Sequence, residues 1–113
     1  MKLTIITVCF NAADDLKKTL DSILTQTFID FEYLVVDGGS KDNTLTLLES
    51  YKPLFVKESK VFRYVSEPDK GTYDAMNKGI QLAKGEWINY MNAGDSFYKD
   101  STLYEFFSVS LPE

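Results

Sequence analysis

The chain has 113 residues, of which 44% are hydrophobic and 14% aromatic, enough for one domain with a packed core and too few for two. Its formal net charge is −5 without a basic cluster, which excludes a surface for nucleic acid or anionic lipid, and no apolar run is long enough for a membrane span or a secretory signal. The absence of histidine excludes imidazole-based catalytic triads and the usual zinc sites, so any bound metal would have oxygen ligands, as Mg²⁺, Mn²⁺ and Ca²⁺ prefer.

The first strand and the first helix are predicted from two different apolar patterns. Residues 3–10 (LTIITVCF) form a continuous β-branched run, typical of a strand buried on both faces. The single cysteine, Cys9, lies in this run, cannot form an internal disulfide and so favours a reducing cytoplasm. Asn11 is expected to cap the helix that follows, with Asp14 close to a capping-box position. The apolar residues of that helix recur at helical spacing: Ala13, Leu16, Leu20, Ile23 and Leu24.

The middle of the chain predicts a second strand, a short helix and a third strand. Residues 31–36 (FEYLVV) are the second strand, and the turn DGGSKDN follows it. The apolar stripe of the helix is Leu47, Leu48 and Tyr51. Pro53 would close or kink this helix. Residues 60–66 (KVFRYVS) are predicted to form a third, less buried strand.

The last part of the chain predicts two more helices around a fourth strand. The stripe of the first of these helices is Tyr73, Met76, Ile80 and Ala83. Gly85 is expected to end it in the C′ position. Residues 86–91 (EWINYM) begin like a buried strand, and residues 101–107 (STLYEFF) start the final helix with Ser101 as its cap.

The alternation of strands and helices predicts an α/β fold in which residues 1–113 form a single domain. Such units build a Rossmann-like, mostly parallel open sheet with helices on both faces. Ligands of these sheets bind beyond the carboxyl ends of the strands, near the point where the strand order reverses. Polar segments follow the predicted strand ends and are expected to converge on one edge: Asn11, Asp37, residues 67–77 and Asp95.

The first candidate site is VVDGGSKDNT, residues 35–44. A carboxylate at a strand end, here Asp37, can accept N–H bonds from the edge of a nucleotide base, and Gly38 and Gly39 would let a ring or a phosphate approach. The motif is neither a P-loop nor the dinucleotide-binding fingerprint. In the alternative interpretation, Asp37 only ends the strand and the glycines only make the turn.

The second candidate site is SEPDKGTYDAMNKG, residues 66–79. Lys70 lies near a predicted helix N-terminus, where both the amides and the ammonium group attract phosphate. Asp74, Asn77 and Lys78 fall on one face of that helix. The alternative is an exposed ion pair between Asp74 and Lys78 after an ordinary turn.

The third candidate site is MNAGD, residues 91–95. A carboxylate after small residues, here Asp95, can give a divalent cation part of its ligand shell and leave positions for phosphate and water. The alternative is a surface acid that follows a strand and a turn.

Together these motifs resemble the N-terminal, nucleotide-sugar-binding half of the family 2 glycosyltransferases, which have the GT-A fold. The matching segments occur in order over roughly residues 3–107: TIITVCFN, QTFIDFEYLVVDGGSKDNT, EPDKGTYDAMNKGIQLAKGEWI and YMNAGDSF. The resemblance is to bacterial members that build surface polysaccharides. It implies a metal-dependent, inverting enzyme that transfers a sugar from a nucleoside-diphosphate sugar, expected to be a UDP-sugar, to a glycan or lipid-linked acceptor.

The resemblance also implies roles for individual residues. Val8, through its backbone, and Phe10 would line the base pocket, and Asp37 would hydrogen-bond the N–H of uracil or guanine. Asp95 would bind Mn²⁺ or Mg²⁺ as the last acid of a DxD-like signature. The residues that would border the base and phosphates are Asp69, Lys70 and Gly71, and those that would flank the diphosphate–sugar are Asp74 and Asn77. The donor-binding set is therefore Val8, Phe10, Asn11, Asp37, Asp69, Lys70, Gly71, Asp74 and Asn77.

The sequence departs from the family pattern at two points. Gly94 stands where many members carry a further acid, which should weaken metal contacts. In this family the general base comes from the segment after the metal-binding acid, so it is expected beyond Glu113. Asp100 and Glu105 are only weak candidates for the base, and this chain is expected to carry the donor site alone.

The end of the chain implies further packing. The final helix is expected to expose Phe106 and Phe107, which suggests that the C-terminal part of the fold is missing and that a homo-oligomer could form. The resemblance implies a cytoplasmic enzyme acting at the inner face of the membrane, with no membrane span and no nucleic-acid partner.

Two alternatives belong to other functional classes. The first is a non-catalytic nucleotide-sugar-binding module, which would bind a nucleoside diphosphate without turnover. The second is a phospho-accepting receiver domain, which also has early acids, here Asp14 and Asp15, and an acid at a strand end. Spacing argues against a receiver, because Asp37 follows the early pair after one helix–strand step, whereas the phospho-acceptor of a receiver lies two strands on.

Overall fold

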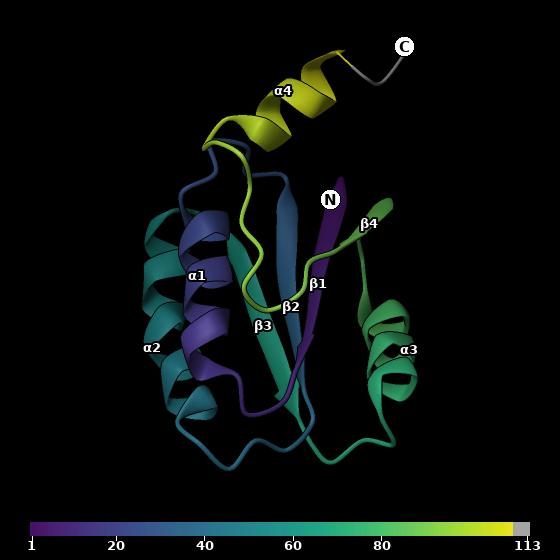
Figure 1. Cartoon of the computed structure of the whole chain (residues 1–113). Coiled ribbons are helices and arrows are strands. Elements are labelled where there is room, and N and C mark those ends of the chain that lie inside the picture. Colours follow the sequence, from purple (N-terminus) through teal and green to yellow (C-terminus); the bar gives the residue numbers. More distant parts are fainter. Residues whose placement is uncertain (110–113) are drawn as a thin grey trace.

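The computed structural model of the protein describes residues 1–109 and contains a four-stranded sheet. The strands are β1 (Leu3–Cys9), β2 (Phe31–Asp37), β3 (Val61–Ser66) and β4 (Trp87–Tyr90). Neighbouring strands are parallel, in the order β3-β2-β1-β4 (Figure 1). Cys9, Asp37 and Ser66 are paired across the ends of three strands. The predicted parallel open sheet is confirmed, and three of its strands end at the same level.

Helices cover both faces of the sheet, as predicted. They are α1 (Ala13–Leu24), α2 (Thr44–Lys57), α3 (Thr72–Leu82) and α4 (Thr102–Val109). Helices α1 and α2 lie on one face and α3 lies on the other (Figure 1). The chain therefore changes face between β3 and β4, and the strand order reverses beside β1. In open α/β sheets, this reversal creates a ligand crevice at the carboxyl ends of the strands.

Alternating residues of the strands form two apolar layers. The layer beneath α1 and α2 includes Ile5, Leu16, Leu20, Tyr33, Val35, Leu48 and Phe55, and the layer beneath α3 consists of Ile6, Leu34, Val36 and Ala75. A β-carbon at Gly79 of α3 would lie 2.9 Å from Cγ2 of Ile6. Glycine at this position therefore allows α3 to approach the sheet closely.

The two edge strands differ from the central pair in burial. The side chains of β3 are mostly half-buried, which confirms the prediction of a less buried strand. The expectation that residues 86–91 begin as a buried strand is wrong, because Trp87 is 49% exposed and Ile88 is 42% exposed. Within residues 1–109, β4 pairs only with β1, and the other edge of β4 has no strand beside it.

Two predicted helix boundaries are wrong because tertiary contacts use the residues differently. Asn11 does not cap α1, whose N-cap is Ala12 without a side-chain hydrogen bond. Gly85 is not the C′ residue of α3, which ends at Leu82 with Ala83 as its C-cap. A β-carbon at Gly85 would lie 2.5 Å from the backbone of Leu3, so this glycine serves the close approach of the chain to β1.

The other two helices also differ in detail from the prediction. Helix α2 continues past Pro53 to Lys57, so the proline does not close it. Ser101 precedes α4, but its hydroxyl contacts the carboxylate of Glu105 instead of a backbone amide. Phe106 is 49% exposed as expected. Phe107 instead packs against the core, with its ring stacked on Phe28 at a centroid distance of 4.9 Å.

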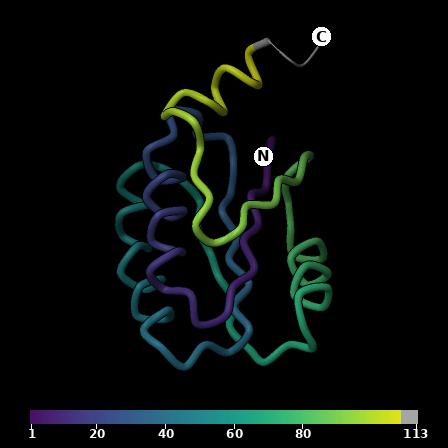
Figure 2. Tube along the Cα trace, viewed as in Figure 1, coloured from purple at the N-terminus to yellow at the C-terminus, as the bar shows by residue number. Residues whose placement is uncertain are grey.

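The chain after β4 runs back across the side of the sheet that carries α1 before it reaches α4 (Figure 2). This path brings residues 92–103 into contact with α1 and with Gln26 just beyond its end, far away in the sequence. In the part of the chain that the structure describes, no helix is both long and apolar enough to cross a membrane.

Candidate functional site

A cavity of about 320 Å³ lies at the carboxyl end of β1, beside the point where the strand order reverses. It is lined by the end of β1 and the start of α3: Val8, Cys9, Phe10, Asp69, Gly71, Thr72 and Ala75. Four of the predicted donor-binding residues, Val8, Phe10, Asp69 and Gly71, are therefore brought together. A concave site with apolar walls and a few polar groups at this position is the usual geometry of a ligand site in an α/β sheet.

Asp69 lines this cavity, and Gly38 leaves room for its carboxylate. A β-carbon at Gly38 would lie 2.8 Å from Oδ2 of Asp69, so a side chain at position 38 would displace the carboxylate. Oδ1 of Asp69 accepts a hydrogen bond of 3.0 Å from the amide of Gly71. Gly71 has a φ of 118°, and a β-carbon there would meet nothing within 4 Å. The start of α3 is thus open to a ligand at Gly71.

Asp37 lies behind the wall of the cavity and is fully buried. Its Oδ2 accepts hydrogen bonds from the amides of Gly39 at 3.1 Å and Ser40 at 2.8 Å, and from the hydroxyl of Ser66 at 2.8 Å. Its Oδ1 accepts from the Ser40 hydroxyl and from the Cys9 thiol. These contacts join the ends of β1, β2 and β3, so Asp37 stabilises the loop that follows β2.

The environment of Asp37 keeps its carboxylate charged. Burial acts to raise the pKa of Asp37, but the hydrogen bonds from Ser40, Ser66 and Cys9 outweigh it and hold the pKa below its usual value. Burial and the neighbouring carboxylate together raise the pKa of Cys9, so this thiol stays protonated and donates its hydrogen bond. The predicted bond from Asp37 to a base remains a prediction, and it would require one of these contacts to be given up.

Asn11 connects the loop after β1 to the loop after β2. It has a φ of 49°, and its Oδ1 accepts hydrogen bonds from the amides of Lys41 at 2.8 Å and Asp42 at 3.3 Å. Its own amide donates to the Ser40 hydroxyl at 2.8 Å. A short polar side chain tolerates this left-handed conformation. Asn11 thus shapes the rim of the candidate site, and its contact with a donor stays a prediction.

The remaining predicted donor-binding residues lie outside the lining of the cavity. Lys70 and Asn77 are exposed. Oδ2 of Asp74 accepts a hydrogen bond of 2.9 Å from the amide of Lys70, which fixes the loop before α3. Lys78 lies 3.0 Å from Glu67 and 3.7 Å from Asp74. The alternative ion pair between Asp74 and Lys78 therefore exists, but it is longer than the one with Glu67.

Asp95 lies on the other side of β1, in an exposed turn that docks on α1. Its amide donates to the carbonyl of Asn92 at 2.9 Å, and its Oδ2 accepts from the amide of Asn92 at 3.0 Å. A β-carbon at Gly94 would lie 3.6 Å from Cγ of Asp15, so a second carboxylate flanks the turn. Sequence reasoning treated Asp15 only as part of an early acidic pair.

The donor set around Asp95 suits a shared cation. Among residues 1–109, no group of three or more histidine, cysteine, aspartate or glutamate side chains could hold a metal by itself. Mg²⁺ and Mn²⁺ commonly bind through one or two carboxylates and complete their shells with phosphate and water. The exposed carboxylate of Asp95 fits that kind of site, in which a bound diphosphate would supply further oxygen ligands.

The comparisons with known proteins agree with this geometry. A family model described as Glycosyl transferase family 2 matches residues 4–109. A PGL/p-HBAD biosynthesis glycosyltransferase of Mycobacterium bovis (strain BCG / Pasteur 1173P2) is 42% identical over 100 residues, which are 88% of this chain and 38% of that protein. The glycosyltransferase YibD of Escherichia coli (strain K12) is 30% identical over 104 residues, 92% of this chain and 28% of that protein. The chain thus spans about a third of the length of the curated relatives it matches.

Solved structures share the fold. TarS 1–349 of S. aureus, in complex with UDP-GlcNAc, has a TM-score of 0.82 at 24% identity and covers 96% of this chain and 30% of its own. The mannosyltransferase PcManGT of Pyrobaculum calidifontis, in complex with GDP-Man and Mn²⁺, has a TM-score of 0.84 at 23% identity. The match covers 98% of this chain and 33% of the mannosyltransferase chain. The likeness confirms the GT-A fold, and the family match excludes the receiver-domain alternative. The chain is a member of glycosyl transferase family 2.

Proposed function

We propose that this chain is the donor-binding part of a glycosyltransferase that moves a sugar from a nucleoside-diphosphate sugar to a glycan or lipid-linked acceptor in polysaccharide biosynthesis. The observation that carries the proposal is the cavity at the end of β1, which gathers Val8, Phe10, Asp69 and Gly71. Names of related proteins support it, since the solved neighbours are complexes with UDP-GlcNAc and with GDP-Man and Mn²⁺. We place the enzyme in the cytoplasm, at the inner face of the membrane.

The base of the nucleotide would occupy this cavity. The ring of Phe10 is 57% exposed at its rim and offers a flat apolar surface against which a base can pack. Uracil and guanine both carry ring N–H groups, and a carboxylate accepts such donors well. Because the oxygens of Asp37 already have partners, we assign first contact with the base to Asp69, and we expect a uracil nucleotide.

The diphosphate would lie next to the start of α3. The open space at Gly71 allows a phosphate to reach the backbone, and the amides at a helix N-terminus favour negative charge. Lys70 is exposed beside this position and would add a positive charge. The diphosphate would then extend across the end of β1 toward the turn that carries Asp95.

Asp95 would hold a Mn²⁺ or Mg²⁺ ion together with the diphosphate. Such an ion neutralises the negative charge that develops on the departing nucleoside diphosphate. Asp15 would raise the local negative charge, which partly replaces the carboxylate missing at Gly94. With a single direct carboxylate, the ion should bind weakly without nucleotide and tightly with it.

Transfer itself would proceed with inversion. The acceptor hydroxyl would attack the anomeric carbon from the face opposite the diphosphate, so that one carbon–oxygen bond forms while the bond to the phosphate oxygen breaks. The hydroxyl proton would pass to a carboxylate base. We place this base beyond Glu113, in accord with the third of the relatives' length that the chain spans.

Calorimetric titration of the chain with UDP, GDP and dTDP, each with and without Mn²⁺, tests the proposal. We expect UDP to bind in the presence of Mn²⁺ and Asp69→Asn to weaken it about ten-fold, as expected for loss of one charge-assisted hydrogen bond. Glu58→Gln, which removes an exposed acid at the C-terminal end of α2, away from the cavity, is the matched control. Failure of every nucleotide to bind would contradict the proposal.

A further inference from the structure

Helix α1 and the segment just beyond its C-terminal end carry three polar side chains next to an otherwise apolar helix face. Thr19 is fully buried, Gln26 is 2% exposed and Ser22 is half-buried. Thr19 and Ser22 are three residues apart and lie on one side of α1, and Gln26 follows two residues after the helix ends at Leu24. Buried polar groups on a core-facing helix require partners. Their partners all lie in the segment that follows β4.

Thr19 contacts the turn of Asp95 at more than one peptide group. Its Oγ1 accepts a hydrogen bond of 2.9 Å from the amide of Gly94. Its hydroxyl lies 2.7 Å from the carbonyl oxygen of Asp95 and 3.3 Å from that of Asn92, and donates to them. One buried hydroxyl therefore anchors the backbone on both sides of the position that carries the carboxylate.

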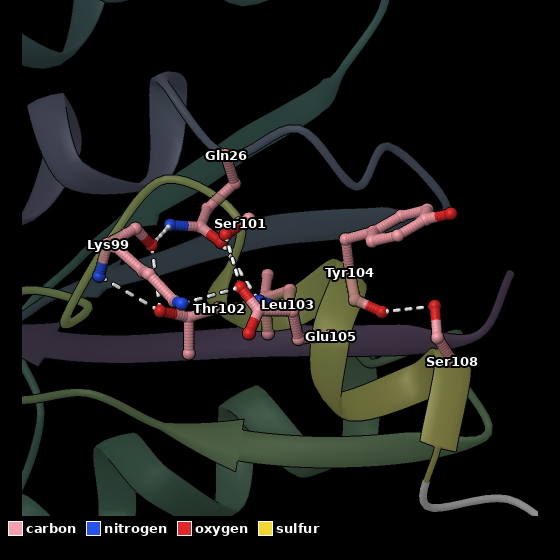
Figure 3. Close-up of polar contacts among 8 residues, drawn as sticks. All are labelled: Gln26, Lys99, Ser101, Thr102, Leu103, Tyr104, Glu105 and Ser108. Carbon is pink, nitrogen blue, oxygen red and sulfur yellow. Dashed lines mark hydrogen bonds and ion pairs between the residues drawn. The ribbon is translucent and has the colours of Figure 1, made fainter.

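Ser22 of α1 and Gln26, just beyond the end of α1, continue these contacts. The Ser22 hydroxyl accepts a hydrogen bond of 2.7 Å from the amide of Phe97. Nε2 of Gln26 donates to the carbonyl of Lys99 at 2.9 Å, and its Oε1 accepts from the amide of Leu103 at 3.1 Å (Figure 3). The backbone of residues 92–103 is thus attached at three successive places, two on α1 and one just past its C-terminal end.

We propose that Thr19, supported by Ser22, is a positioning residue that sets the location of Asp95 for the cation. The proposal rests on the proposed function, in which Asp95 binds a cation shared with the diphosphate. The carboxylate of Asp95 is exposed, and its own contact is to Asn92 within the same turn. The place of the turn on the molecule is therefore fixed through its backbone, by Thr19 and Ser22. Binding of a metal is sensitive to displacements of a fraction of an ångström in its ligands.

Two substitutions separate the effect of the Thr19 hydroxyl from the effect of side-chain packing at this position. Thr19→Val keeps the shape of the side chain and removes the hydrogen bonds, whereas Thr19→Ser keeps the hydroxyl. Ser50→Ala is a matched control, because Ser50 bonds to the Leu47 carbonyl on the exposed side of α2, away from the site. Ser22→Ala is a second probe, since it removes the bond to Phe97 two residues beyond Asp95.

The test measures UDP affinity with and without Mn²⁺ for the wild type and these variants of the 113-residue chain. We expect Thr19→Val to lose at least ten-fold in Mn²⁺-dependent affinity while its metal-free UDP affinity stays within two-fold. Thr19→Ser should keep most of the Mn²⁺-dependent UDP affinity that Thr19→Val loses. Ser22→Ala should lose about three-fold in this affinity, and Ser50→Ala should have the affinity of the wild type. A purely structural role would lower the melting temperature without separating the two affinities.

The outcomes distinguish this proposal from the proposed function. If Mn²⁺ does not raise the UDP affinity of the wild type, the proposed cation role of Asp95 fails, and this proposal fails with it. If Mn²⁺ raises the UDP affinity of the wild type and of Thr19→Val by the same factor, only the positioning role of Thr19 is overturned. If Thr19→Val does not fold, Ser22→Ala decides, and wild-type Mn²⁺ dependence in that variant overturns the proposal.

Discussion

Oδ2 of Asp69 lies 2.8 Å from the place where a β-carbon would stand at Gly38, in a loop from a different part of the chain. The acid that enters the cavity thus occupies space that a glycine leaves free. We predict that Gly38→Ala moves the Asp69 carboxylate and weakens UDP binding about five- to ten-fold, since one charge-assisted hydrogen bond is lost or distorted. Titration with UDP in the presence of Mn²⁺ measures this effect.

The fold should tolerate Gly38→Ala, because the atom that must shift is the end of a flexible side chain. In Asp69→Asn the same substitution at position 38 should have a smaller additional effect, since the two act through one contact. An unchanged UDP affinity in Gly38→Ala would show that Asp69 does not contact the nucleotide.

Asp37 should stabilise the fold in a pH-dependent way. Asp37→Asn should lower the free energy of unfolding at pH 7 by about 2–4 kcal/mol, because buried donors from Gly39 and Ser40 lose a charged acceptor. The folded-state pKa of Asp37 is held below its usual value of about 3.9. Its contribution is therefore present at neutral pH and is lost as the pH falls from about 4 through the folded-state pKa.

Urea unfolding at several pH values checks this prediction. The wild type should lose stability below about pH 4 more steeply than Asp37→Asn does. Asp14→Asn, at an exposed position in the first turn of α1, is the control and should keep the wild-type slope. Equal slopes for the wild type and Asp37→Asn would argue that the carboxylate is not a structural element and would favour the predicted contact with a base.

The contrast between two glycines gives another test of the packing. Gly85→Ala should destabilise the protein by about 3 kcal/mol or more, because its β-carbon would overlap the backbone of Leu3 and Thr4 at 2.5 Å. Gly71→Ala meets open space and should cost only about 1–2 kcal/mol of strain from its φ of 118°. Thermal unfolding of both variants compares them, and a larger loss for Gly71→Ala would contradict the structure.

The elements of the fold could be predicted from the sequence because each is encoded locally. The apolar run of residues 3–10 and the helical stripe from Ala13 to Leu24 have distinct periods, and the structure contains a strand and a helix there. The ends of helices were less predictable, since Asn11 and Gly85 are used by distant segments. No local pattern reveals that the Asn11 side chain will bond to Lys41.

The candidate site was predictable in position but not in its internal contacts. The rule that ligands bind at strand ends led to Asp69 and Gly71, and the family resemblance added Val8 and Phe10; the structure places these four residues around one cavity. It could not show that Ser66, on another strand, would help to enclose Asp37. The role of Thr19 was also missed, although a threonine on the buried face of a helix is a signal that could have indicated a buried polar contact.

The central claim is that the cavity at the end of β1 and the turn of Asp95 enclose one donor and one cation. Paramagnetic Mn²⁺, added at low ratio to the isotope-labelled protein with saturating UDP, tests it most directly by broadening nearby amide resonances. We predict broadening of both the residues around Gly71 and those around Asp95, none near Lys57 at the end of α2, and loss of the effect in Asp95→Ala. Broadening confined to one of the two segments, or unchanged in Asp95→Ala, would contradict the account.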